Sequence, residues 1–186
     1  MISITTKFKI IDRGFSEVIA LAPGWATDYR IFTTIDLSYN YLLPVDFNPF
    51  DFKQSLSEFL DASSIDRVSL FGWSIGGFLV SEFAAENTKK VDELILLSIR
   101  KRYDEKVLEE IRFKIGKNKR AFLYRFYLDC FSGDDSQGLC WFKEHLLKQY
   151  VDKMSVEYLL EGLDYLSNAR METKALSGLK KIRIFH

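Results

Sequence analysis

Residues 71–78 read FGWSIGGF and place Ser74 between Gly72 and Gly76, directly after an apolar run at 68–71. The following residues, 75–86, are apolar almost all round, which predicts a buried helix. The G-x-S-x-G pattern between a strand and a helix is typical of a sharp turn that exposes a nucleophilic serine. This five-residue pattern also arises by chance. The flanking elements and a third glycine, Gly77, favour the catalytic interpretation of Ser74.

The rest of the chain extends this alternation of strand and helix. Strands are predicted at 17–22, 39–47, 66–71 and 91–99, and an amphipathic helix at 52–62. Such an order predicts an α/β fold with a mostly parallel sheet and helices on both faces. Helical periodicity then dominates from 103 to about 167, and strand character returns at 181–185. We therefore expect residues 1–102 to form the N-terminal part of the core, 103–170 a helical cap insertion, and 171–186 the return to the core.

Composition describes an ordinary globular protein. The 186 residues carry 47% hydrophobic and 28% charged side chains, with 26 basic and 26 acidic residues. A zero net charge gives no general attraction to nucleic acid or membrane. No signal peptide or membrane span is recognisable, so the cytoplasm is the expected compartment. Cys130 and Cys140 lack metal-ligand spacing and are predicted to be reduced thiols, so no metal site is expected.

A second loop supports acyl-transfer chemistry. Residues 22–28, APGWATD, follow the first predicted strand. Hydrolysis through a serine needs two backbone amides directed at the oxyanion, and the amides of Ile75 and Trp25 are the candidates. A structural turn with an aromatic lid is the alternative for Trp25. Trp73 and the aromatic-rich segment around Phe126 are candidates to line an acyl-chain pocket, although a plain interface between cap and sheet explains the aromatic segment equally well.

These motifs together resemble the α/β-hydrolase superfamily. GWSIGG at 72–77 is similar to the G-W-S-L-G-G of the biotin-pathway carboxylesterases that act on pimeloyl-[acyl-carrier-protein] methyl ester, and PGWA at 23–26 is similar to their H-G-W-G. Pro23 replaces the His and Ala26 replaces a Gly of that pattern. The resemblance spans nearly the whole chain. It implies that Ser74 forms an acyl-enzyme, that Trp25 and Ile75 hold the oxyanion, and that neither a metal nor an organic cofactor is needed.

The base of a serine triad is not recognisable in the sequence. His145 lies in the helical insertion and is expected to be an ordinary helix residue, while His186 follows the last predicted strand. Asp104 is a weak candidate acid. By the resemblance, the triad acid and histidine are expected beyond position 186, so that the C-terminal part of the fold is missing and this polypeptide has little triad catalysis. Two alternatives remain open, another esterase or thioesterase of the same fold and a non-catalytic acyl-binding relative.

Residues 100–125 form a basic stretch. They hold ten Lys or Arg and four Asp or Glu, a net charge of +6 (10 − 4). One interpretation is a solvated helical face with i to i+4 ion pairs such as Glu110 with Lys114. The other is a docking patch for an acidic partner, and an acyl carrier protein fits the resemblance. The predicted docking residues are Arg112, Lys114, Lys117, Lys119, Arg120 and Arg125. No nucleic-acid-binding motif accompanies the charge.

Overall fold

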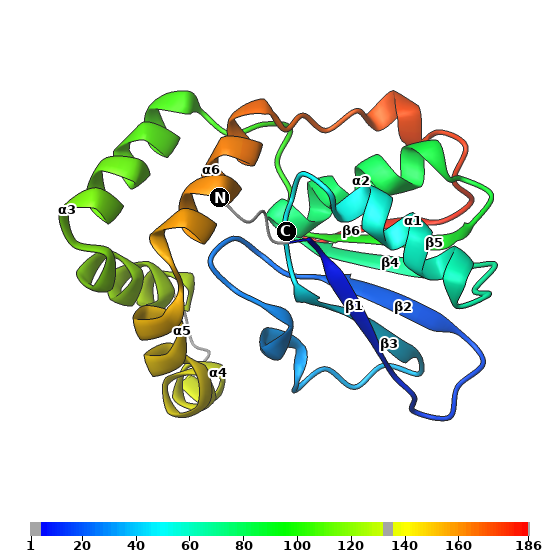
Figure 1. Cartoon of the computed structure of the whole chain (residues 1–186), viewed down its shortest axis with the longest axis horizontal. Helices are drawn as coiled ribbons and strands as arrows, with labels where there is room; N and C mark the ends of the chain where they lie inside the picture. The colour runs from blue at the N-terminus through cyan, green and yellow to red at the C-terminus, as the bar shows by residue number, and fades with distance from the viewer. Residues whose placement is uncertain (1–4, 132–135, 186) are drawn as a thin grey trace.

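The computed structural model describes residues 5–131 and 136–185. Its centre is a six-stranded sheet with strand order β1-β3-β2-β4-β5-β6 (Figure 1). β1 pairs antiparallel with β3, and every other pair is parallel, which confirms the predicted mostly parallel sheet. The strands are β1 (Lys7–Ile11), β2 (Val18–Ala22), β3 (Asn40–Asp46), β4 (Val68–Trp73), β5 (Val91–Leu97) and β6 (Ile182–Phe185).

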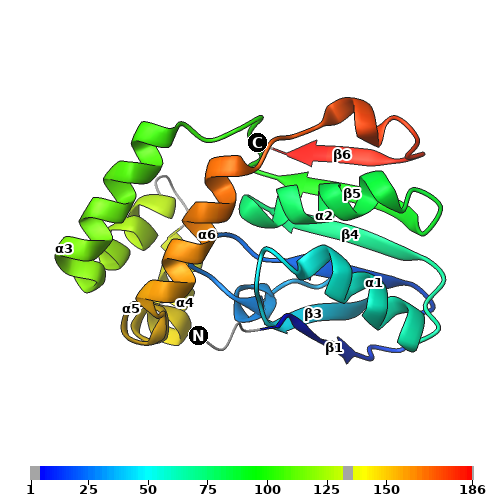
Figure 2. The same ribbon diagram turned by 45° about the horizontal axis from the view of Figure 1, so that its top comes forward.

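Helices cover one face of the sheet and build a separate cap at one of its ends. α1 and α2 lie over one face, as Figure 2 shows, while the opposite face carries the short 3-10 helix η1 in the described part. The cap consists of α3 to α6 and lies to the left in both views. The helices are η1 (Tyr29–Phe32), α1 (Phe52–Ala62), α2 (Ile75–Glu86), α3 (Glu105–Cys130), α4 (Ser136–Phe142), the π-helical turn η2 (Lys143–Leu147), α5 (Lys148–Lys153), α6 (Val156–Asn168) and the 3-10 helix η3 (Thr173–Leu176).

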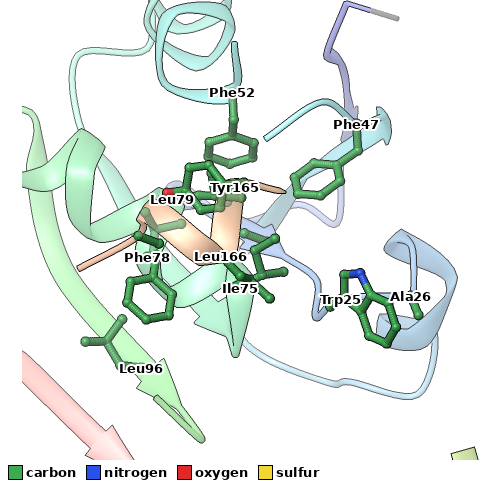
Figure 3. Close-up of a cluster of buried hydrophobic side chains, with 14 of the residues drawn as sticks. Trp25, Ala26, Phe47, Phe52, Ile75, Phe78, Leu79, Leu96, Tyr165 and Leu166 are labelled. Carbon is green, nitrogen blue, oxygen red and sulfur yellow. The ribbon is translucent and has the colours of Figure 1, made fainter. Parts of the chain in front are cut away.

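Alternation along the strands divides the core into two clusters. Leu70 of β4 belongs to the large cluster on the α1/α2 side, and its neighbour Phe71 packs with the smaller cluster, edge to face with Phe32 of η1. Successive strand residues point to opposite faces, so both faces need apolar side chains. The large cluster continues into the cap, and Figure 3 shows Tyr165 and Leu166 of α6 beside Ile75 and Leu79 of α2.

One strand was not predicted. β1 lies at the sheet edge, and its residues, KFKII, are exposed or half-buried, so they show no clean alternation. β3 contains a proline, Pro44, which the interior of a strand rarely accommodates. Pro44 lies beyond the last residue that pairs with β2 and opposite Phe8, next to a register shift in β1. A residue without an N–H is tolerated at such an irregularity.

The cap contains the predicted helices with two interruptions. α3 continues across a kink at Asn118, whose φ of −162° and ψ of 88° are not helical. The segment 141–151 holds a π-helical turn between α4 and α5. His145 lies on this turn, stacks on Trp141, and its Nδ1 is 2.9 Å from the Trp141 carbonyl oxygen. These contacts are those of an ordinary helix residue.

Candidate active site

Ser74 occupies a sharp turn between β4 and α2. Its φ of 55° and ψ of −115° lie outside the regions that an L-residue favours, and such a conformation costs about 1–3 kcal/mol. Two backbone hydrogen bonds hold the turn: the Ser74 amide donates to the Leu97 carbonyl at 3.0 Å, and the Gly77 amide donates to the Ser74 carbonyl at 2.9 Å. The end of the neighbouring strand β5 therefore helps to hold Ser74 in its strained conformation. This is the turn geometry that the sequence motif predicts.

The glycines around Ser74 are required by close packing. A Cβ on Gly72 would lie 2.5 Å from the Gly76 carbonyl oxygen and 2.5 Å from the Gly77 Cα. A Cβ on Gly76 would overlap the Ala22 carbonyl oxygen and lie 2.7 Å from that of Pro23. These neighbours are backbone atoms and cannot rotate away. Gly77 instead faces the side chain of Ile99, 2.7 Å from the position of its Cβ, so its constraint is softer.

The Ser74 side chain faces a cavity of about 530 Å³ between the sheet and the cap. Its Oγ lies 3.0 Å from the Tyr103 hydroxyl oxygen. The wall is mostly apolar and comes from both parts of the fold. The residues that line the cavity are Gly24, Trp25, Trp73, Ser74, Ser98, Ile99, Arg100, Tyr103, Leu108, Ile111, Phe126, Cys130, Leu163 and Leu166. The three residues predicted to bind substrate, Trp25, Trp73 and Phe126, are thus all in the wall of the cavity that Ser74 faces.

The two predicted oxyanion donors lie at the start of a helix and in a turn. Ile75 is the first residue of α2, where backbone amides have no intrahelical acceptor. In the turn after β2, the hydrogen bond runs from the Thr27 amide to the Gly24 carbonyl at 3.2 Å, and it does not use the Trp25 amide. Trp25 lies in the wall of the cavity that Ser74 faces, and Ile75 directly follows Ser74, which also lies in this wall. Their role as donors stays a prediction.

The cap fixes the turn that contains Trp25. The indole Nε1 of Trp25 donates to the Leu159 carbonyl at 2.9 Å, and the indole ring contacts Phe126 edge to face at 5.2 Å. The position of a Gly162 Cβ is only 2.6 Å from the Trp25 ring, so α6 approaches the indole through a glycine. The aromatic-lid interpretation of Trp25 therefore applies to its indole ring. These contacts do not use its backbone amide, which is the group predicted to bind the oxyanion.

Three tyrosines of the cap donate to the residues that follow Trp25. Tyr127 of α3 donates to the Ala26 carbonyl, Tyr158 of α6 to the Thr27 carbonyl at 2.9 Å, and Tyr150 of α5 to the Asp28 carboxylate at 3.0 Å. Burial raises the pKa of each of these phenols well above its usual value, and Asp28 raises them further. The three hydroxyls therefore remain neutral donors at physiological pH.

A second, apolar cavity adjoins the first. It has a volume of about 260 Å³ and shares Trp73, Phe126 and Cys130 with the cavity at Ser74. Its remaining described lining comes from the turn after β2, from η1 and the residues after it, from β4 and β5, and from the cap, and includes Phe32 and Phe131. The aromatic-rich segment thus lines a hollow beside the nucleophile, and its members Tyr127 and Phe142, which are buried and packed against each other, also lie in this wall.

The described residues bring no histidine to Ser74. His145 does not line the cavity, and His186 lies outside the described residues. Asp104 caps α3, where its carboxylate accepts from the Lys106 amide at 2.8 Å. Sequence reasoning missed two residues that do face the cavity, Arg100 and Tyr103. A signal was present, since both follow β5 at the carboxyl end of the sheet, where open α/β sheets bind their ligands.

Much of the predicted docking patch on α3 is neutralised within the chain. The Glu110–Lys114 pair predicted from spacing is present at 2.7 Å, and Arg112 pairs with Asp164 at 2.6 Å. Arg120 pairs with Asp152, Arg125 with Asp129, and Lys119 donates to the Met154 carbonyl. Within the described part of the chain, Lys117 and Lys119 are the two patch residues without a carboxylate partner, and Lys119 donates to backbone carbonyls instead.

Two further properties concern ligands and membranes. Within residues 5–131 and 136–185 no group of three His, Cys, Asp or Glu side chains is arranged to hold a metal ion. Cys130 and Cys140 are free and exposed. None of the described helices combines the length and the apolar character that crossing a membrane requires.

Comparisons with known proteins agree with this geometry. A family model for the alpha/beta hydrolase fold matches residues 23–162. Maspardins of Danio rerio and Homo sapiens are 38% identical over 84 residues, which cover 44% of this chain but only 24% of theirs. The match therefore spans about a quarter of the length of these relatives.

Solved structures with the same fold cover almost all of this chain. A bromoperoxidase from Bacillus anthracis has a TM-score of 0.79 at 15% identity, covering 98% of this chain and 79% of its own. An esterase from Exiguobacterium antarcticum has a TM-score of 0.78 at 15% identity, covering 97% and 77%. A structure from a study of carboxylesterases of the ammonia-oxidizing thaumarchaeon Nitrososphaera gargenis has a TM-score of 0.71 at 20% identity and covers 98% of this chain and 76% of its own. At these identities the likeness establishes the fold.

Proposed function

Because the chain belongs to the alpha/beta hydrolase fold family, we propose that it acts as a serine carboxylesterase in which Ser74 is the nucleophile. The observation that carries this proposal is the strained turn at Ser74, whose hydroxyl faces a cavity between sheet and cap. A non-glycine residue is held at such a φ only where the surrounding structure compensates for its cost.

The proposed reaction proceeds in two steps. Ser74 Oγ attacks the ester carbonyl carbon, its proton passes to a general base, and the negative oxygen of the tetrahedral intermediate is stabilised by the Trp25 and Ile75 amides. The carbon–oxygen bond to the alcohol then breaks, and the alcohol leaves with the proton. Water attacks the resulting acyl-enzyme in the same way, which releases the acid and restores Ser74.

The adjoining apolar cavity supports an acyl substrate. Trp73 and Phe126 lie between the two cavities, so an acyl chain attached to Ser74 can extend past them into an apolar environment. Burying methylene groups there is favourable by about 0.8 kcal/mol each. We retain a methyl ester of a carrier-bound acyl group, as in the biotin-pathway carboxylesterases, as the proposed substrate, and a thioester or another small ester as the alternative.

The test is covalent labelling of Ser74. The open reading frame that encodes these residues is expressed to its stop codon, and the product is treated with a fluorophosphonate and analysed by mass spectrometry. We expect one label on Ser74 and none in Ser74→Ala. An unlabelled Ser74 in the wild type would instead favour the non-catalytic acyl-binding relative.

We also propose that an acidic carrier protein docks on α3, with Lys117 as the principal contact. Its ammonium group has no carboxylate partner in the described part of the chain, whereas Lys114 is paired with Glu110. Lys117→Glu is expected to slow hydrolysis of a carrier-bound ester and to spare a small nitrophenyl ester. Lys114→Glu is the matched control for a charge change on the same helix. An equal effect of Lys117→Glu on both substrates would refute docking at this residue.

A further inference from the structure

Arg100 contributes the charge in the wall of the cavity that Ser74 faces. Among the described residues that line this cavity there is no Asp, Glu, Lys or second Arg. The other polar members are hydroxyls and a thiol, and the rest of the wall is apolar. Arg100 is exposed, but on the side where it borders this apolar wall its guanidinium is less screened than in open water and attracts an anion more strongly.

The backbone around Arg100 is fixed on both sides. Ser98 has a φ of 51° and donates its amide to the Phe185 carbonyl at 2.9 Å, and Ile99 packs against Gly77 of α2. The Lys101 carbonyl accepts from the Met171 amide at 2.9 Å. Arg100 thus lies between two anchored neighbours, on a segment whose position relative to Ser74 is determined by the fold.

Tyr103 connects Arg100 to the nucleophile. The Arg100 Cζ lies 5.6 Å from the centroid of the Tyr103 ring, and the hydroxyl of the same ring lies 3.0 Å from Ser74 Oγ. The ring itself packs against Phe78 of α2. One aromatic ring therefore separates the guanidinium from the reacting hydroxyl, which is a distance that a short substrate spans.

Arg100 differs from most arginines of the chain in having no acceptor of its own. Within the described part, a carboxylate lies within ion-pair distance of Arg13, Arg30, Arg67, Arg112, Arg120, Arg125 and Arg183. Arg170 donates to two backbone carbonyls. Arg100 and Arg102 have neither kind of partner there, and of these two only Arg100 lines the cavity.

We propose that Arg100 binds a carboxylate carried by the substrate, so that the cavity accepts free half-esters of dicarboxylic acids in addition to the carrier-bound methyl ester proposed above. The proposal rests on the proposed function, because it places the ester at Ser74 and the free carboxylate at Arg100. A carboxylate matches the single guanidinium in charge and in its paired donors, whereas a phosphate carries more charge than one arginine neutralises. The stacking of Arg100 on Tyr103 keeps the guanidinium in place without using its N–H donors.

The experiment compares the binding of two esters of equal chain length, monomethyl adipate and methyl hexanoate. Binding is followed by tryptophan fluorescence, because Trp25 and Trp73 line the cavity. At neutral pH and low salt we expect the anionic ester to bind about tenfold more tightly, the effect of one charge-assisted hydrogen-bonded contact. In Arg100→Gln the two esters should bind with about equal affinity, and the affinity for methyl hexanoate should equal that of the wild type. The unchanged binding of methyl hexanoate also shows that the variant is folded.

Lys101→Gln is the matched control, since it removes a charge from the same segment outside the cavity wall, and it should keep the preference. Equal binding of the two esters to the wild type, binding of neither, or a preference that survives Arg100→Gln would each overturn the proposal. The readout needs no turnover and is repeated in Ser74→Ala. If the protein prefers monomethyl adipate but the fluorophosphonate does not label Ser74, the proposed esterase activity is refuted, while anion binding at Arg100 is supported.

Discussion

The hydroxyl oxygens of Ser74 and Tyr103 lie 3.0 Å apart, so the candidate nucleophile is hydrogen-bonded to a residue from the segment after β5. Ser74 reaches this position from the turn between β4 and α2, and Tyr103 from the residues just before α3. The contact joins the sheet to the entrance of the cap. Either hydroxyl can be the donor, and when Ser74 donates its proton to Tyr103 it must exchange this partner for a base before it attacks a substrate.

Replacement of Tyr103 by phenylalanine tests this exchange. Tyr103→Phe keeps the ring on Phe78 and removes the hydroxyl, so the hydrogen bond, worth about 1 kcal/mol, no longer opposes attack by Ser74. We expect Ser74 to be labelled by a fluorophosphonate about fivefold faster, with unfolding by urea nearly unchanged. Slower labelling of the variant would show that the Tyr103 hydroxyl assists the reaction.

Close packing at Gly76 predicts a large cost for a single methyl group. In Gly76→Ala the new Cβ would collide with the carbonyl oxygens of Ala22 and Pro23, and we expect a loss of about 3 kcal/mol in the free energy of unfolding. Gly116→Ala is the control, because no atom lies within 4 Å of its Cβ position on α3. That change should stabilise the protein by about 0.5–1 kcal/mol. Urea unfolding of both variants measures the difference, and equal effects would contradict the packing described here.

Alkaline pH should weaken the contact between cap and core. The pKa of Tyr127 is raised in the folded protein by burial, so the unfolded chain loses this proton first and stability falls as the pH rises above about 10. Below that pH the contribution is fully present. Tyr127→Phe should make the decline between pH 10 and 11.5 shallower by up to about 1.4 kcal/mol per pH unit, measured by urea unfolding. An unaltered slope would show that Tyr127 does not carry this dependence.

Glu93 predicts a dependence at acid pH. Its buried carboxylate on β5 pairs with Arg183 and with Lys181 at 3.1 Å. Burial alone would raise the pKa of Glu93, but the hydrogen bonds from these two residues outweigh burial and lower it. The stabilisation is therefore present above about pH 4.3 and is lost as the pH falls through the lowered pKa.

Glu93→Gln should accordingly cost about 1–2 kcal/mol at pH 7 and less at pH 3, measured by urea unfolding at both pH values. Asp92→Asn is the control from the same strand, because Asp92 forms an exposed pair with Arg67, and such pairs contribute less than about 1 kcal/mol. A cost of Glu93→Gln that is equal at both pH values would rule out the proposed linkage.

The local sequence pattern was sufficient to predict the strand and the helix on either side of the turn at Ser74. The apolar run before Gly72 and the apolar helix after Gly76 each follow from a few adjacent residues, and the turn between them has the predicted geometry. β1 could not be found in this way, because an edge strand with half-exposed residues has no strong period. The kink at Asn118 was also missed, since no proline marks it.

Contacts between distant segments were beyond the reach of sequence patterns. The tyrosines that donate to residues 26–28 lie more than 100 positions further along the chain, and only the folded cap brings them to that turn. The same holds for Arg112, whose partner Asp164 lies on α6. Charge counting along α3 therefore indicated a basic surface, while the fold shows that much of this charge is internally compensated.

The tyrosine hydrogen bonds to the turn at 26–28 have a consequence for how the molecule admits a substrate. Three cap helices each donate a hydrogen bond to one of three consecutive residues of this turn. If the cap moved away as a rigid body, the turn would lose these three hydrogen bonds, and Trp25 would lose its hydrogen bond to α6. Entry to Ser74 and integrity of one wall of the site are thereby coupled. A core domain from which the cap helices have been removed would therefore lose this wall of the site and its activity, and would not gain a more accessible active site.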